Sequence, residues 1–139
     1  MSTIYLVSCV SLKQSVPCEA KELYRSNWFQ KARAYVESMD MPWYILSARH
    51  GLINPDEVIA PYEQTLNEMP ISERRAWAEK VGGQLSGLIS PSDQVVVLAG
   101  ARYREFLMPR LLRLAAGIQV PMEGMRIGEQ LSWLGKHHG

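Results

Sequence analysis

The sequence contains few of the residues from which metal sites and covalent cross-links are built. Only two of its 139 residues are cysteines, Cys9 and Cys18. A chain of this length can bury a substantial core without disulfides, which favours two reduced thiols. There is no C-x-x-C pair, no H-E-x-x-H motif and no carboxylate cluster of the kind that holds a metal ion. We therefore predict neither a metal site nor a cofactor.

Long apolar runs and a strong charge of one sign are also missing. No run approaches the roughly 20 residues that a membrane span needs, and the first residues lack the layout of a signal peptide. The net charge is +1, from 15 basic and 14 acidic residues, so nucleic acid could be bound only through a local basic patch. We predict a soluble, cytoplasmic protein with no membrane partner.

Four short apolar runs rich in β-branched residues are typical of buried strands. They cover residues 3–9, 43–48, 94–99 and 118–120. Segments with helical spacing of apolar residues fall between and after them, at 24–39, 72–88, from Ala101 onward and at 127–134. The alternation predicts one α/β domain over residues 1–139, a Rossmann-like three-layer sandwich. Its sheet would be mostly parallel, with four or slightly more strands and helices on both faces.

Helix boundaries and one long loop complete the predicted organisation. Ser26 and Ser72 are suitable N-caps, and Pro109 should kink or restart the helix that follows Ala101. Residues 10–22 are interpreted as a loop. Residues 51–71 contain three prolines, which disfavour a regular helix or a central strand. Long ordered loops often have functions, so 51–71 is predicted to be an active-site loop.

Polar residues lie at the carboxyl ends of the first two predicted strands. Cys9, Ser11 and Lys13 lie at and just past the end of the first. An ammonium group beside a thiol favours the reactive thiolate, and a lysine could also hold a phosphate or carboxylate. The alternative is a small buried cysteine and a solvated lysine.

Ser47, Arg49, His50 and Gly51 lie at and just past the end of the second predicted strand. The histidine suits proton transfer, the arginine suits binding of an anion, and the glycine could supply a positive φ or let a ligand approach the backbone. The alternative is an exposed turn.

The remaining candidates follow the third and fourth strands or lie in the long loop. Gly100, Arg102 and Tyr103 open a helix whose first amides could bind an anion, although the pattern is not a complete dinucleotide or phosphate loop. Tyr62 could stack on a base or simply pack on the core. Glu123 could contact a hydroxyl-bearing ligand, and Gly124 allows a turn. If the strands are parallel, all these clusters meet at one edge of the sheet, where open α/β folds bind ligands.

Several short motifs together resemble a bacterial and phage domain family of uncharacterised function. They are Cys9-x-x-x-Lys13, Leu23-Tyr24-x-Ser26-x-x-Phe29, Leu46-Ser47-Ala48-Arg49-His50-Gly51-Leu52, Pro61-Tyr62, Gly100-x-x-Tyr103 and Gly124-x-x-x-Gly128. That family resembles the YaaA proteins, which are linked to peroxide stress and DNA. Cys9, Lys13 and Ser26 also resemble, more distantly, the Cys-x-x-x-Lys motif domain of archaeosine synthase. This resemblance implies a catalytic role for these three residues in modifying a base.

Two functional hypotheses follow from the site and the resemblance. The first is an enzyme that acts on a nucleobase, nucleoside or nucleotide, by N-glycosidic or base-modifying chemistry. Cys9, Lys13 and His50 would be catalytic, and Glu105 or Glu123 would supply a carboxylate. The second is a non-catalytic module that binds a nucleotide or single-stranded nucleic acid through arginines such as Arg49 and Arg102. A third possibility is a homo-oligomer, or a subunit of a larger complex whose partner supplies the missing carboxylate or domain.

Overall fold

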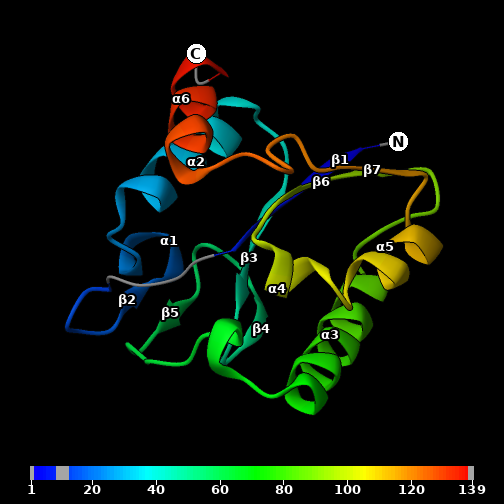
Figure 1. Ribbon diagram of the computed structural model, residues 1–139, viewed down its shortest axis with the longest axis horizontal. Helices are drawn as coiled ribbons and strands as arrows, with labels where there is room; N and C mark the ends of the chain where they lie inside the picture. Colours follow the sequence, from blue (N-terminus) through cyan, green and yellow to red (C-terminus); the bar gives the residue numbers. More distant parts are fainter. Residues whose placement is uncertain (1, 9–12, 138–139) are drawn as a thin grey trace.

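The protein is built around a five-stranded, mostly parallel sheet (Figure 1). The computed structural model describes residues 2–8 and 13–137. The parallel strands are Thr3–Ser8 (β1), Trp43–Ser47 (β3), Gln94–Leu98 (β6) and Gly117–Gln119 (β7). One further strand, β4 (Gly51–Ile53), pairs antiparallel with β3, so the order is β4-β3-β1-β6-β7. The four predicted parallel strands are confirmed, and β4 is an addition to them.

Helices pack on both faces of this sheet. They are Ala20–Leu23 (α1), Asn27–Ser38 (α2), the 3-10 turn Leu66–Glu68 (η1), Ile71–Ser86 (α3), Ala101–Arg104 (α4), Met108–Leu114 (α5) and Ile127–His137 (α6). Figure 1 shows α2 and α6 together on one side of the strands, with α3 and α5 on the other. The chain is therefore of the predicted α/β class.

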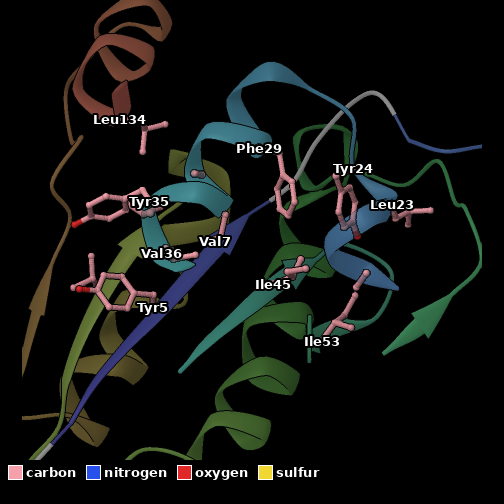
Figure 2. Packing of buried hydrophobic residues seen from close by; sticks show 14 of the residues in the cluster. Tyr5, Val7, Leu23, Tyr24, Phe29, Tyr35, Val36, Ile45, Ile53 and Leu134 are labelled. Atoms are coloured by element: carbon pink, nitrogen blue, oxygen red, sulfur yellow. The ribbon is translucent and has the colours of Figure 1, made fainter. Parts of the chain in front are cut away.

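The alternation of β1 side chains explains why the core has two halves. Tyr5 and Val7 point to one face, where they join the buried residues of α2 and Leu134 of α6 (Figure 2). Ile4 and Leu6 point to the other face, where they join the apolar stripe of α3 and residues of α5. Successive strand residues point to opposite faces, so a strand buried on both sides has to be apolar throughout. This accounts for the unbroken apolar runs.

Local differences from the predicted elements have simple causes. The helix expected at 24–39 begins only at Asn27, because Ser26 caps it: its Oγ accepts a hydrogen bond from the amide of Phe29 at 3.1 Å. Ser72 was the wrong cap for α3, since that helix begins at Ile71 after Pro70. The helix after Ala101 divides into α4 and α5, and Pro109 lies in the first turn of α5, as the predicted restart requires.

The two stretches expected to be loops carry short strands. Residues 10–22 include β2 (Cys18–Glu19) and the start of α1, and residues 51–71 include β4, β5 (Val58–Ile59) and η1. β2 and β5 pair antiparallel in a separate two-stranded sheet.

Cys18, in β2, is a free thiol. Among the residues that the structure describes, no helix is both long and apolar enough to cross a membrane.

Candidate functional site

The carboxyl ends of β1 and β6 are neighbours, and the chain leaves them in opposite directions. After β1 it passes through α2 to β3, whereas after β6 it passes through α4 and α5 to β7. In parallel α/β sheets this divergence opens a crevice where ligands bind. Ser8, the last residue of β1, and Gly100, just beyond β6, border a pocket of about 420 Å³ at this point. We call it the edge pocket.

The edge pocket combines aromatic and amide side chains. Its lining is Ser8, Ser26, Asn27, Trp28, Asn67, Gly100, Tyr103, Ile127, Gln130 and Leu131. None of these lining residues is charged, and the polar ones offer hydroxyl and amide groups. Such a surface suits a flat, uncharged ligand with hydrogen-bonding edges.

The indole of Trp28 is held in place by an amide from the far end of the chain. Trp28 Nε1 donates to Gln130 Oε1 at 2.8 Å, and Gln130 Nε2 donates to the carbonyl of Met125 at 2.9 Å. Because both ends of the Gln130 amide are engaged, the ring has a fixed orientation. Tyr103 is also held, edge-on against Trp77 with ring centroids 5.5 Å apart. The aromatic walls of the edge pocket are therefore preorganised.

A second, larger pocket contains charged groups. This pocket of about 640 Å³, the lysine pocket, is lined by Lys13, Gln14, Ser15, Pro61, Tyr62, Glu63, Gln64 and Thr65. Thr65 lines this pocket and Asn67 lines the edge pocket. Two residues span at most about 7 Å of chain, so the linings of the two pockets come close to each other at this point.

Buried hydroxyl groups meet behind the lysine pocket. The oxygen of Tyr62 lies 2.6 Å from that of Tyr24 and accepts a hydrogen bond from Ser47 Oγ at 2.8 Å. Ser47 Oγ in turn accepts the amide N–H of His50 at 3.1 Å. Lys13 Nζ lies over the Tyr62 ring, 4.6 Å from its centroid. A cation, two phenols and a serine hydroxyl thus form one connected group.

His50 lies against this group as a neutral imidazole. Its ring stands edge-on to Tyr62, with centroids 5.5 Å apart, and within the described chain its buried Nε2 has no hydrogen-bond partner. Burial lowers the pKa of His50, and the charges of Arg49 and Lys80 lower it further, against the opposing effect of Glu57. The imidazole is therefore uncharged at neutral pH.

Comparison with known proteins places the whole fold in one family. Residues 4–136 match the model of a family of unknown function, DUF6884. The chain belongs to this family. It is also similar to the uncharacterized protein YfjM of Bacillus subtilis (strain 168), with 29% identity over 97 residues, which are 66% of this chain and 61% of that protein. The chain thus matches less than two thirds of the length of this relative.

Several of the predicted site residues of this DUF6884 chain come together. Lys13, Ser47, His50 and Tyr62 form the connected group behind the lysine pocket. Ser26, Gly100 and Tyr103 line the edge pocket. Cys9 and Ser11 lie outside the described residues. Among the residues that the structure describes, no group of three or more histidine, cysteine or acidic side chains could hold a metal ion.

Other predicted site residues lie outside the two pockets or allow a turn of the backbone. Arg49 is exposed, and Arg102 pairs with Glu105 at 3.6 Å. Glu123 pairs with Arg104 at 3.0 Å. Gly51 and Gly124 have φ angles of +77° and +80°, the conformation that glycine adopts without strain. These two glycines shape turns, and neither lines one of the two pockets.

Sequence reasoning missed the aromatic and amide side chains that complete the site. Tyr24, Trp28, Asn67 and Gln130 were not among the predicted site residues, although all contact or line it. Trp28 does carry a signal, since it lies two residues after the Ser26 cap, on the first turn of a helix that starts at the site edge. Gln130 carries none, because its contact with Trp28 joins positions 102 residues apart.

Proposed function

We propose that this protein is an enzyme that acts on a nucleobase, nucleoside or nucleotide. The base would bind in the edge pocket, and the sugar side of the ligand would face the lysine pocket. We also propose that the sheet is of the Rossmann-like type, because ligand sites of that type lie at the same crevice between diverging strands. The chemistry would be cleavage of an N-glycosidic bond or modification of the base.

The observation that carries this proposal is the character of the edge pocket. It has a fixed indole for stacking, neutral amides and hydroxyls for the edge of a base, and a volume of about 420 Å³, within the usual range for small-molecule sites. Stacking of a base on an aromatic side chain contributes about 1–3 kcal/mol. A charged metabolite without a flat apolar part would gain little from this lining.

We propose that the lysine pocket supplies the carboxylate that glycosidic chemistry requires. A developing cationic sugar needs a carboxylate nearby, and the leaving base needs a proton. Glu105 and Glu123, the carboxylates considered from the sequence, are engaged in ion pairs with Arg74 and Arg104. Glu63 lines the lysine pocket together with Lys13, so we propose Glu63 as the carboxylate of the site.

The alternative, a nucleic-acid-binding module, receives less support. Arg102 and Arg104 are paired with acidic side chains, which reduces the positive field that a polyanion would meet. We also propose that the activity is cytoplasmic. The relation to YaaA proteins and to the archaeosine synthase domain rests on the short motifs, and it is part of the same proposal.

Calorimetry and thermal shift with the purified full chain test this function. The ligands are nucleobases, nucleosides, nucleotides and short single-stranded oligonucleotides, each at low and high salt. A ligand at 100 times its Kd stabilises a protein by about 2.7 kcal/mol, which raises the Tm by several degrees. We expect a monomeric ligand to bind with little dependence on salt. Binding of oligonucleotides alone, weakening steeply with salt, would favour the module instead.

A pair of tryptophan variants locates the binding. Trp28→Leu removes the stacking surface and should weaken the ligand by about 5-fold to 150-fold, the equivalent of 1–3 kcal/mol. Trp133→Leu is the matched control, because Trp133 is also half-buried in α6 but does not line the edge pocket. Equal affinities of the two variants would contradict the placement of the base.

Chromatographic turnover assays then separate the two chemistries. Glu63→Gln should abolish release of a free base if the glycosidic bond is cleaved, and it should leave base modification largely intact. Lys13→Met and His50→Ala should lower turnover in either case while the fold is retained. Full turnover in both of these variants would overturn the catalytic assignment.

A further inference from the structure

Ser8 ends the apolar run of β1 at the point where the strand reaches the edge pocket. Residues 4–7 are buried and belong to the core, and Ser8 follows them with an exposure of only 5%. By the alternation of the strand, Ser8 continues the row of Ile4 and Leu6, which pack among apolar and aromatic side chains. Packing alone would favour alanine or valine at this position, because a hydroxyl group loses its hydration on burial.

The hydroxyl group of Ser8 differs from those of two serines near it. Ser26 Oγ accepts a hydrogen bond from the amide of Phe29 at 3.1 Å. Ser47 Oγ donates to the oxygen of Tyr62 at 2.8 Å. Among the described residues, the hydroxyl group of Ser8 has no hydrogen-bond partner. Because buried hydroxyl groups are nearly always hydrogen-bonded, a partner from outside the described chain is indicated.

The oxygen of Ser8 can be reached from the edge pocket. Ser8 is one of the residues that line this pocket. Within the part of the chain that the structure describes, Nε2 of His50 is the one side-chain polar atom that is both fully enclosed and without a partner. The Ser8 oxygen is therefore not fully enclosed, and a ligand in the edge pocket can contact it.

The rest of the lining decides what kind of ligand suits this hydroxyl group. The described lining contains no charged side chain, which favours a neutral ligand. The ring nitrogens, carbonyls and amino groups of a flat heterocycle lie along its edge, and a hydroxyl group can donate to the first two and accept from the third. An analogue without such a group leaves the buried hydroxyl unpaired and binds more weakly.

We infer that Ser8 is a specificity-determining residue of the edge pocket. Its hydroxyl group forms a hydrogen bond with the edge of a neutral, flat heterocycle, and it distinguishes that ligand from analogues without a hydrogen-bonding group at the same place. The inference rests on the proposed function for the class of heterocycle, a nucleobase that is free or part of a nucleoside.

Unfolding without any ligand is the first test. Ser8→Ala removes one oxygen atom and no carbon, so the packing of β1 is retained. Because an unpartnered buried hydroxyl destabilises the folded chain, the denaturant midpoint should stay the same or rise. Ser47→Ala is the matched control, since Ser47 is also buried but has partners, and its midpoint should fall. A midpoint that falls in both variants would overturn the inference.

Binding of matched heterocycles is the second test. Calorimetry compares purine with adenine and hypoxanthine, and pyrimidine with cytosine and uracil, in the unmodified protein and in Ser8→Ala. We expect the unmodified protein to prefer at least one substituted base over its parent ring. Ser8→Ala should lose about 2-fold to 12-fold of that preference, the range of one hydrogen bond. Unchanged preferences in Ser8→Ala would contradict the role of Ser8.

A third comparison separates the role of Ser8 from the proposed substrate. If no nucleobase or nucleoside binds, the proposed function is wrong, and ligand-observed NMR then compares benzimidazole with benzimidazolone, which are not nucleobases. A preference for benzimidazolone that Ser8→Ala removes would keep the role of Ser8 with another class of heterocycle. Absence of binding by both probes would overturn that role. A nucleobase that binds the unmodified protein and Ser8→Ala with equal preference would overturn it and leave the proposed function intact.

Discussion

Polar side chains on the two sides of β1 are used in opposite ways. On the β3 side, Ser47 and Tyr62 are buried and linked by hydrogen bonds. On the β6 side, Arg102 and Glu123 are more than half exposed and form ion pairs at the surface. The folded protein is destabilised when a buried polar group is left without a hydrogen-bond partner, whereas a surface ion pair contributes only about 0–1 kcal/mol to its stability. Substitutions of polar residues are therefore expected to cost more stability on the β3 side than on the β6 side.

The largest predicted effect is at Trp77, which connects the two sides. Its Nε1 donates to the carbonyl of Ser47 at 2.8 Å, and its ring packs against Tyr103. Trp77→Ala should lower the free energy of unfolding by about 3–5 kcal/mol, because it leaves a cavity and removes a buried hydrogen bond. Denaturant unfolding measures this loss. Trp77→Phe, which keeps most of the ring volume, should lose clearly less, and equal losses would contradict the argument.

Ser47→Ala tests the buried hydroxyl group itself. The substitution removes the acceptor of the His50 amide and the donor to Tyr62, and both Ser47 and Tyr62 are buried. We expect a loss of about 1–3 kcal/mol in denaturant unfolding. Ser86→Ala is the control, because Ser86 is exposed and bonds only to a carbonyl of its own helix. A loss as small as that of the control would mean that the hydroxyl group is dispensable for stability.

The pH dependence of stability should separate the buried histidine from surface charges. The pKa of folded His50 is lowered below its ordinary value of 6.5, chiefly by burial, so the unfolded chain binds the proton more readily. Its contribution is complete above about pH 6.5 and is lost as the pH falls toward the folded pKa. Thermal unfolding from neutral to mildly acidic pH should show this decline, and His50→Phe should reduce it. An unchanged slope in the variant would refute the assignment.

Asp93 sets the lower limit of the pH range in which the effect of His50 on stability can be measured. Hydrogen bonds from the amides of Ser90 and Ser2 lower the pKa of its carboxyl group from the ordinary 3.8. The stability that this carboxylate contributes is complete above about pH 4 and falls away below it. The His50 measurement therefore belongs between about pH 5 and pH 7, where Asp93 is ionised in the folded and in the unfolded chain.

The smallest effect is expected on the β6 side. Glu123→Gln removes the charge that pairs with Arg104, and the glutamate side chain is 68% exposed. The free energy of unfolding should change by less than about 1 kcal/mol, and the difference should shrink at high salt. A loss larger than that of Ser47→Ala would reverse the comparison between the two sides.

The four parallel strands could be predicted because each is short, apolar and buried on both faces. β4 could not be predicted, because it has three residues, begins with a glycine and depends on pairing with β3. The four-residue helix α1 lacks a side-chain cap, so nothing local marks its start. In both cases tertiary contacts decide the conformation, and local preference does not.

The residues of the candidate site also fall into those that the sequence could predict and those that it could not. Lys13 and His50 follow strands in the sequence and Ser47 ends one, so a parallel sheet brings all three to one edge and their grouping could be predicted. The contact of Tyr24 with Tyr62 joins positions 38 residues apart through their hydroxyl groups. No spacing rule indicates such a contact, because it depends on how α1 and the 51–71 segment fold against each other.

At the outer edge of the sheet, one N–H group of β4 is occupied by a side chain from α3. The amide of Leu52 donates to Gln84 Oε1 at 2.9 Å, and a Cβ on Gly51 would lie 2.6 Å from the same oxygen. An edge strand whose N–H groups are unoccupied can pair with a strand from another molecule. Gln84 occupies one of these groups, and α3 covers the strand beside it. Lateral growth of the sheet into chains of copies, a common route to aggregation, is therefore hindered on the side of the sheet where Ser47 and Tyr62 are buried.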